Sequence, residues 1–506
     1  MVIAEHYDLI VVGGGVNGTG IAADAASRGL KVLLCEQNDL GSATSSRSSK
    51  LIHGGLRYLE HHEFSLVRKA LAEREVLLKN APHIMHPLRF VLPHQSHLRP
   101  AWLIRLGLFL YDNLASRATL PGSRSVRFDA NSPLKATISK GFTYSDVWVD
   151  DARLVILNAK AAEQHGATII NYCRCTHIDQ HDNQWRVSLQ PQHGQSFQVT
   201  SDALVNAVSP WVSSLFGDID NYQAPQQIRL VKGSHIIVPK IHDGDEAYIL
   251  QNPDGRIIFV SPFEQAYSLV GTTDVEYAGP PNDAAISQQE IDYLINSANH
   301  YFKHQITAND IVSTYSGVRP LMNDESVEAQ KVTRDYTVVQ NWQNSQLPLI
   351  SAFGGKITTY RKLAEAVVDT LKPKFPAMTA CRTQSMPLPG GDFTDRDTLL
   401  AALCQDYGFV PKPTLARYVR QFGTDTRQLL LNCMQLIDLG QDFGCGLYQK
   451  EVDYLVQQEW ASCAEDILWR RTKLGLQLSE EQQQSLSNYL AMFELPITTA
   501  KSVVNL

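Results

Sequence analysis

The chain has 506 residues, so its length predicts two or three domains rather than one hydrophobic core. Apolar residues make up 44% of the chain and charged residues 19%, which is the composition of an ordinary globular protein. A net charge of −7 argues against a nucleic-acid-binding protein, because the binding domain of such a protein is basic.

The N-terminal residues carry the most specific pattern, a βαβ unit. An apolar run over residues 7–12 predicts a strand, residues 19–28 predict a helix, and a second apolar run over residues 31–35 predicts another strand. The turn after the first strand reads Gly-x-Gly-x-x-Gly. In this context the turn is the fingerprint of a dinucleotide-binding site.

Each fingerprint residue has a separate task. Gly13 is expected to make the tight turn, Gly15 to let the backbone approach a pyrophosphate, and Gly18 to let helix and strand pack closely. The helix N-terminus adds free N–H groups and the positive end of its dipole. Glu36 follows Gly15 by 21 residues and can hold a ribose 2′-hydroxyl, which disfavours the 2′-phosphate of NADP.

A segment rich in serine, residues 41–50, begins five residues after Glu36. Its composition is also that of a flexible linker. Because residues this close to Glu36 still contribute to the site of a nucleotide-binding sheet, we favour an ordered loop that lies along the cofactor. A helix is predicted after this loop, over residues 63–79.

The middle of the chain predicts both helices and strands. A helix is predicted over residues 153–168, and a buried strand over residues 203–208. Residues 230–345 hold several β-rich runs and one helix, about residues 287–302, which is the pattern of a twisted antiparallel sheet. A last strand ends in a glycine pair and leads into a helix from about Thr359.

The C-terminal part predicts helices alone. A turn-rich break at residues 387–392 marks its start and predicts a domain boundary. Residues 454–471 are predicted to form one long amphipathic helix, and residues 479–482 form a capping box that marks the start of another.

Metal sites, export signals and membrane spans are not expected. The eight cysteines contain no C-x-x-C pair, which indicates reduced thiols in a cytosolic protein rather than metal ligands. The N-terminus runs straight into the first strand without a signal peptide. No apolar run reaches the length of about 18 residues that a spanning helix needs.

Five motifs occur together: the glycine-rich turn, the serine-rich loop, and the segments 53–58, 314–320 and 353–359. With these motifs in this order, the chain resembles the FAD-dependent glycerol-3-phosphate dehydrogenases, and in particular their aerobic bacterial type. The similarity extends over essentially the whole length. The chain lacks the EF-hand loop of the mitochondrial relatives and the cysteine-rich module of the anaerobic ones.

The resemblance implies an α/β fold in three parts. These are a glutathione-reductase-like, Rossmann-type FAD-binding domain, a substrate (cap) domain built on an antiparallel sheet, and a C-terminal all-helical domain. The FAD-binding domain would be assembled from residues 1–80, 150–229 and 345–386. The substrate domain would comprise residues 81–149 and 230–344, and the helical domain residues 387–506.

Several cationic side chains beside these motifs are candidates for binding an anionic substrate. Arg57 and Lys356 follow glycine pairs and Arg319 precedes a proline, although any single cation can also be an ordinary surface charge. Arginine offers a planar fork to phosphate oxygens and lysine a point charge. The resemblance implies that Arg319 and Arg334 contact the substrate phosphate, and that Arg57, Tyr58 and Lys356 line the same pocket.

The reaction implied by the resemblance is oxidation of sn-glycerol 3-phosphate to dihydroxyacetone phosphate, with hydride transfer to FAD. For the base that takes the hydroxyl proton we choose His235, because an imidazole titrates near neutral pH. A hydrogen-bonded structural histidine is the alternative. Arg319 could instead polarise the hydroxyl, and Lys356 could stabilise negative charge on the reduced flavin.

The positions of the motifs assign the contacts to FAD. Gly13, Gly15 and Gly18 are expected at the pyrophosphate, and Glu36 at the adenosine ribose. The remaining contacts are Ser45, Ser46, Ser48, Ser49 and Leu51 along the path to the flavin, Cys175 at the adenine, Ala207 and Trp211 on the pyrophosphate side, and Gly355, Lys356 and Thr358 at the isoalloxazine.

The stretch from Arg99 to Phe128 is the candidate membrane contact. It holds five arginines and one aspartate, a charge of +4, around an apolar run. This pattern suits an interfacial segment with arginines at anionic lipid headgroups, and a buried core helix is the alternative. The resemblance implies a peripheral protein on the cytoplasmic face of the bacterial inner membrane that reduces a membrane quinone. A homodimer is compatible with it.

Three other functions are compatible with the same motifs. The nearest is an oxidase that passes electrons from glycerol 3-phosphate to oxygen and releases hydrogen peroxide. An amine or amino-acid oxidase would use the same fold on another substrate. A flavin-binding scaffold without turnover is the alternative outside the enzymes.

Overall fold

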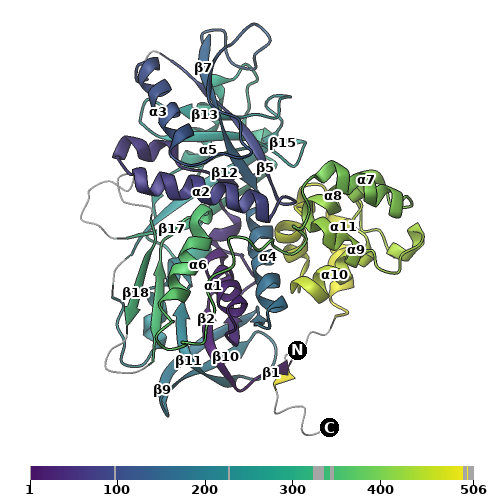
Figure 1. Cartoon of the computed structure of the whole chain (residues 1–506). Helices are drawn as coiled ribbons and strands as arrows, with labels where there is room; N and C mark the ends of the chain where they lie inside the picture. Colours follow the sequence, from purple (N-terminus) through teal and green to yellow (C-terminus); the bar gives the residue numbers. More distant parts are fainter. Residues whose placement is uncertain are drawn as a thin grey trace.

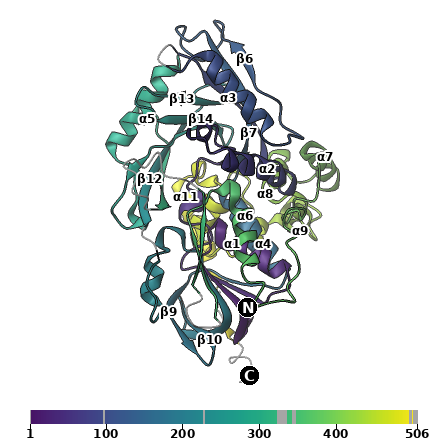
Figure 2. The same ribbon diagram turned by 60° about the vertical axis from the view of Figure 1, so that its left-hand side comes forward.

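The computed structural model of the chain contains two large sheets and a helical C-terminal part, which lies to one side of both sheets (Figures 1 and 2). The structure describes residues 2–95, 98–225, 228–322, 335–341, 347–493 and 498–499. A short parallel pair, β1 (Val2–Ile3) with β20 (Thr498–Thr499), joins the two ends of the chain.

The first sheet is built on the predicted βαβ unit. Its main path runs β18-β19-β11-β2-β3-β8, in which only β18 and β19 pair antiparallel. A hairpin of β9 and β10 continues from β11. The strands are β2 (His6–Val12), β3 (Val32–Cys35), β8 (Thr168–Ile170), β9 (Cys173–His181), β10 (Gln184–Pro191), β11 (Phe197–Asn206), β18 (Thr337–Asn341) and β19 (Leu349–Phe353).

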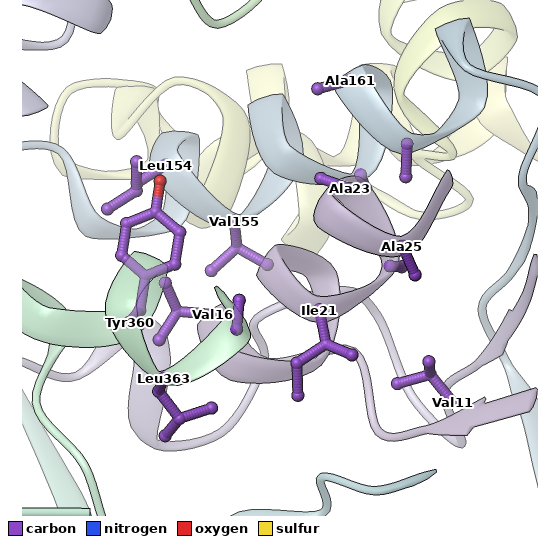
Figure 3. Close-up of a cluster of buried hydrophobic side chains, with 14 of the residues drawn as sticks. Val11, Val16, Ile21, Ala23, Ala25, Leu154, Val155, Ala161, Tyr360 and Leu363 are labelled. Carbon is purple, nitrogen blue, oxygen red and sulfur yellow. The ribbon is translucent and has the colours of Figure 1, made fainter. Parts of the chain in front are cut away.

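Three helices, α1 (Val16–Ser27), α4 (Asp151–Gln164) and α6 (Tyr360–Asp369), form the core beside this sheet. Figure 3 shows their buried side chains, among them Ile21, Val155 and Leu363. Small residues such as Ala23 and Ala161 lie where α1 and α4 approach each other. Close packing of this kind leaves no room for added atoms, so α4 and α6 fix the position of α1.

The second sheet is antiparallel except where β13 and β5 pair in parallel, as the predicted β-rich segment requires. Its path is β16-β12-β15-β14-β13-β5-β7-β4, with β17 beside β12 and β6 beside β7. The strands are β4 (Leu51–Ile52), β5 (Met85–Pro93), β6 (Arg124–Arg127), β7 (Lys140–Val149), β12 (Ile228–Pro239), β13 (Ala247–Gln251), β14 (Ile257–Phe263), β15 (Tyr267–Gly271), β16 (Val275–Glu276) and β17 (Ser313–Met322).

Three helices accompany the second sheet: α2 (Phe64–Asn80), α3 (Ala101–Asn113) and α5 (Gln288–Tyr301). Helix α5 starts at a capping box formed by Ser287 and Glu290. Two short strands belong to a different sheet from the rest of their predicted domain. β4, in the predicted FAD-binding domain, pairs in the second sheet, and β18, in the predicted substrate domain, pairs in the first. The boundaries themselves stay a prediction.

The C-terminal part consists of helices, as predicted, but the single helix expected over residues 454–471 is wrong. Helix α10 ends at Glu459, where Trp460 takes a left-handed φ of +55°. The Asp466 carboxylate then accepts hydrogen bonds from the amides of Ser462 and Cys463, and a π-helical turn follows over Asp466–Arg471. The helices are α7 (Arg396–Asp406), α8 (Lys412–Phe422), α9 (Thr426–Leu429), α10 (Gln449–Glu459) and α11 (Glu480–Leu490).

Candidate active site

The glycine-rich turn joins β2 to α1, and two of its glycines have no room for a side chain. Gly13 has a φ of +111°, and a Cβ there would lie 2.7 Å from the carbonyl oxygen of Ala207. A Cβ on Gly18 would lie 1.8 Å from the carbonyl oxygen of Gly13. The turn is therefore pressed between the helix and β11, and Gly15 leads into α1 without a side-chain cap.

The Glu36 carboxylate lies at the end of β3, next to this turn. It accepts hydrogen bonds from the amides of Gly14 at 2.6 Å and Asn38 at 2.9 Å. Burial raises the pKa of Glu36, and the two amides act against that shift by favouring the charged form. The predicted ribose-binding acid and the predicted pyrophosphate-binding turn are thus neighbours in space.

The serine-rich segment is a hydrogen-bonded loop, not a flexible linker. The buried Asp151 accepts hydrogen bonds from the amide of Ser48 at 3.1 Å, from its hydroxyl at 2.7 Å, and from Lys50 Nζ at 2.8 Å. At the other end of the loop, Ser45 Oγ accepts a hydrogen bond from the amide of Val16 at 3.0 Å. These bonds tie the loop to the N-terminal ends of both α1 and α4.

A cavity opens where the glycine-rich turn, the serine-rich loop and the second sheet meet. It brings together the three predicted catalytic residues, which lie on β12, on β17 and after β19. The predicted site residues that line it are Gly15, Ser45, Ser48, Ser49, Leu51, Tyr58, Ala207, His235, Arg319, Gly355 and Lys356.

His235 lies on β12 with its ring buried at the cavity wall. Its Nε2 is 3.0 Å from Ser49 Oγ, and its ring stacks on Tyr315 at 4.7 Å between centroids. Burial, followed by the charges of Lys50 and Arg319, holds the pKa of His235 well below its usual value of 6.5. The expectation that this imidazole titrates near neutral pH is therefore wrong, because the fold keeps the ring neutral.

Two predicted substrate-binding cations of the cavity have defined partners. Arg319 forms an ion pair with Asp274, a carboxylate that the sequence analysis did not single out. Lys356 Nζ lies 3.6 Å from the centroid of the Tyr58 ring, in a cation–π contact. Together with Arg47, these two cations and the neutral imidazole line the cavity, which is an arrangement suited to a phosphorylated ligand.

Other predicted residues lie elsewhere. Gly13, Gly18 and Glu36 shape the turn without lining the cavity, and neither Arg57, Ser46 nor Thr358 is among the lining residues. Cys175 is buried in β9, and Trp211 lines a neighbouring cavity that shares Thr44, Arg47 and Gly317 with the first. Arg334 lies outside the described residues. The roles assigned to all of these residues stay predictions.

Several lining residues were not predicted. Asn17 occupies one of the variable positions of the fingerprint, Arg47 lies in the serine-rich loop, and His53 begins one of the motifs. All three therefore lie within segments that the sequence already indicates as part of the site. Thr272 and Gly233 carry no such signal. Only the pairing of β12 with β15 and β17 brings their part of the second sheet to the cavity.

The residues present fit FAD. Asn17 lines the cavity, and its buried Oδ1 has no hydrogen-bond partner in the part of the chain that the structure describes. Its amide group donates to the carbonyl of Gly354 at 3.2 Å, so it is held in place while that oxygen stays available to a ligand. The uncapped N-terminus of α1 offers backbone N–H groups to a pyrophosphate.

Residues 8–361 match the family described as FAD dependent oxidoreductase, and residues 381–494 match the C-terminal domain of alpha-glycerophosphate oxidase. The chain belongs to the FAD-dependent oxidoreductase family. This membership confirms the predicted fold class and cofactor, and it explains why a helical part follows the two sheets.

Three relatives are similar to the chain over nearly its whole length. The aerobic glycerol-3-phosphate dehydrogenase of Escherichia coli is 51% identical, with 97% of this chain and 98% of the relative covered. The D-erythritol 1-phosphate dehydrogenase of Brucella abortus is 47% identical, with 95% and 96% covered. The X-ray structure of the glycerol-3-phosphate dehydrogenase from Bacillus halodurans complexed with FAD has a TM-score of 0.74 at 25% identity, with 97% of each chain covered.

Proposed function

We propose that the protein oxidises sn-glycerol 3-phosphate to dihydroxyacetone phosphate with FAD and passes the electrons to a membrane quinone. The single observation that carries this proposal is the convergence of His235, Arg319 and Lys356 on the cavity that the glycine-rich turn enters. A small phosphorylated alcohol needs cations for its phosphate and a neutral acceptor for its hydroxyl proton. The named activity of the E. coli relative agrees with this chemistry.

The chain's own residues bind and orient the substrate. Arg319 and Lys356 both supply positive charge for the substrate phosphate, and the ion pair with Asp274 fixes the position of the Arg319 side chain. The neutral His235 accepts the hydroxyl proton, and the phosphate dianion beside it favours the resulting imidazolium. Bound FAD supplies the two-electron acceptor. Contacts of Arg57 and Arg334 with the phosphate belong to the same proposal.

Anaerobic addition of glycerol 3-phosphate to the purified holoenzyme tests the proposal. We expect the visible flavin absorbance to bleach and dihydroxyacetone phosphate to appear in equal amount. Bleaching by amines or amino acids instead, or no bleaching by any of these compounds, would overturn it. D-Erythritol 1-phosphate is the informative second substrate, because a relative is named for it.

The electron acceptor needs a separate measurement. We expect rapid turnover with a soluble quinone analogue and little hydrogen peroxide in air. Peroxide in amounts equal to the product, with no gain on adding the quinone, would identify an oxidase instead.

Helix α3 supports the proposal of a peripheral membrane protein. Trp102 is 69% exposed, Phe109 55% and Leu106 47%, whereas a buried core helix would hide them. Arg105 and Arg99 accompany this apolar face, as an interfacial helix at anionic lipid requires. Among the described residues, no helix is both long and apolar enough to cross a bilayer. We place this face on the cytoplasmic side of the bacterial inner membrane.

A further inference from the structure

Three buried polar side chains from separate elements meet beneath helix α3. They are Tyr111 of α3, Asp146 of β7 and Arg74 of α2, and each is at most 2% exposed. Tyr111 Oη donates to Asp146 Oδ1 at 2.8 Å, and Arg74 Nη1 donates to the same oxygen at 2.6 Å. A buried polar group is costly unless its hydrogen bonds are made, so such a cluster holds its members in fixed positions.

The Tyr111 hydroxyl has a second partner, which leads toward the cavity. The amide of Gly54 donates to Tyr111 Oη at 2.8 Å. Burial, and then the Asp146 charge, raises the pKa of Tyr111 well above its usual value. The hydroxyl therefore stays protonated and donates a hydrogen bond to Asp146. A continuous path of hydrogen bonds therefore runs from the Gly54 backbone through Tyr111 and Asp146 to Arg74.

The Gly54 amide belongs to a sharp turn with no spare room. A Cβ on Gly54 would lie 2.8 Å from Tyr111 Oη and 2.5 Å from a methyl carbon of Leu71. Gly55 has a φ of +78°, and a Cβ there would lie 2.2 Å from the Tyr58 ring. The orientation of the Tyr58 ring therefore depends on how this turn is held.

The turn delivers two lining residues to the cavity, His53 before it and Tyr58 after it. Tyr58 contacts Lys356 Nζ at 3.6 Å, one of the cations that bind the phosphate in the proposed function. The amide of His53 is held separately by Thr358 Oγ1 at 3.2 Å. Within the turn, the Gly55 carbonyl accepts a hydrogen bond from the amide of Tyr58 at 2.9 Å, and the bond from Gly54 to Tyr111 ties the glycine pair to helix α3.

We propose that Tyr111, fixed by Asp146 and Arg74, is a positioning residue for the substrate end of the cavity. Its hydroxyl holds the Gly54–Gly55 turn, so that the Tyr58 ring and Lys356 keep the geometry that binds the substrate phosphate. Tyr111 itself does not line the cavity. This inference rests on the proposed function, because the phosphate is the group whose binding would suffer.

Replacing Tyr111 by phenylalanine in the full-length holoenzyme tests the inference, because it removes one hydroxyl and keeps the ring. We expect the KM for glycerol 3-phosphate to rise about tenfold, since a displaced binding group holds the substrate and the transition state less tightly to a similar degree. The kcat should change less than about threefold and the affinity for FAD should be unchanged, because the glycine-rich turn and His235 keep their own contacts.

Tyr301→Phe is the matched control. Tyr301 is also fully buried, and its hydroxyl donates to the carbonyl of Gln251 at 2.5 Å, away from the cavity. It should lose a similar amount of thermal stability with no change in KM. Asp146→Asn is a second variant that retains an acceptor for Tyr111 and should raise KM less than Tyr111→Phe.

The possible results are distinct. An equal KM for Tyr111→Phe, Tyr301→Phe and the unmodified protein would show that the Tyr111 hydroxyl is only structural, and would overturn the inference alone. Failure of the unmodified protein to oxidise glycerol 3-phosphate would overturn the proposed function, and the inference with it.

Discussion

At the scale of single residues, burial in the fold decides the protonation state of His235. Because its pKa is held well below 6.5, the neutral ring is present throughout the physiological range. We therefore expect kcat/KM for glycerol 3-phosphate to fall at low pH only with the second ionisation of the substrate phosphate, at about pH 6, and to show no further acid limb from His235. The pH profile of flavin reduction under anaerobic conditions measures this directly.

Replacing His235 by asparagine tests whether the ring is the base. Loss of a general base lowers the rate of the chemical step by about 10²- to 10⁴-fold, and stopped-flow bleaching of the flavin measures that step. FAD binding should persist, because the glycine-rich turn and the Asn17 amide that line the same cavity are unchanged. A reduction rate within about threefold of the unmodified protein would assign His235 a structural role, the alternative that the sequence left open.

Single residues also show where sequence reasoning succeeds and where it stops. Gly13 and Gly18 were predicted correctly as positions where a side chain cannot fit, because the fingerprint encodes a local turn. The partner of Arg319 and the low pKa of His235 were not predictable. Both depend on burial and on neighbours such as Asp274, which only the pairing of distant strands provides.

At the scale of elements, helix α3 carries the membrane proposal on one face, and on the other it carries Tyr111, which holds the Gly54–Gly55 turn. Its exposed side chains include Trp102, Leu106 and Phe109, while Tyr111 points into the protein. Deleting the whole segment would remove both functions together. Point substitutions on the exposed face separate them.

We expect the triple substitution Trp102→Ser, Leu106→Ser and Phe109→Ser to weaken binding to anionic lipid vesicles by at least about tenfold. The reason is that each large apolar side chain contributes roughly 1.5–3 kcal/mol when it leaves water. Activity with a soluble electron acceptor should persist, because Tyr111 is unchanged. Vesicle sedimentation measures the binding.

A matched control is available in the helical part, where Met434 is 83% exposed and Ile437 78%. Serine at both positions also removes exposed apolar surface, but it should leave vesicle binding unchanged. Release by the control, or undiminished binding of the α3 variant, would contradict the assignment of this face.

Elements were predicted well wherever local pattern decides them, as with α1, α5 and the capping box at Ser479. The predicted helix over residues 454–471 failed because its apolar spacing continues across a break. Asp466 starts a new turn there, and Arg470 and Arg471 reach Asp39, more than 400 residues earlier in the chain. A contact of that range leaves no trace in local periodicity.

At the scale of the whole molecule, the helical part is joined to the first sheet through buried ion pairs. Asp39 pairs with Arg470 and Arg471, and Lys473 Nζ lies 2.8 Å from Asp150. The presence of a helical domain was predictable from composition. The way it packs against the first sheet was not predictable, because the chain has 45 basic and 52 acidic residues and the sequence does not reveal which of them form ion pairs.

Glu459 of α10 is the test of this docking. Its fully buried carboxylate pairs with Arg153 and lies 3.8 Å from Lys160, both on α4. Glu459→Gln leaves the buried Arg153 without its charge partner, while Lys160 keeps Asp425 at 3.1 Å, and we expect the free energy of unfolding to fall by about 3–5 kcal/mol. Urea denaturation measures it. Glu465→Gln, at a side chain that is 70% exposed and paired with Arg470, should cost about 1 kcal/mol or less.

The pH dependence of the same variant separates charge pairing from packing. Burial alone would raise the pKa of Glu459, but the charges of Arg153 and Lys160 outweigh it and lower the pKa below 4.5. A lowered pKa contributes stability above pH 4.5, and that stability is lost as the pH falls through the folded-state pKa. The difference between the unmodified protein and Glu459→Gln should therefore shrink as the pH falls below about 4.5. If the difference in the free energy of unfolding stayed constant with pH, Glu459 would stabilise the protein through its packing and not through its charge. The helical part would then be held by packing contacts.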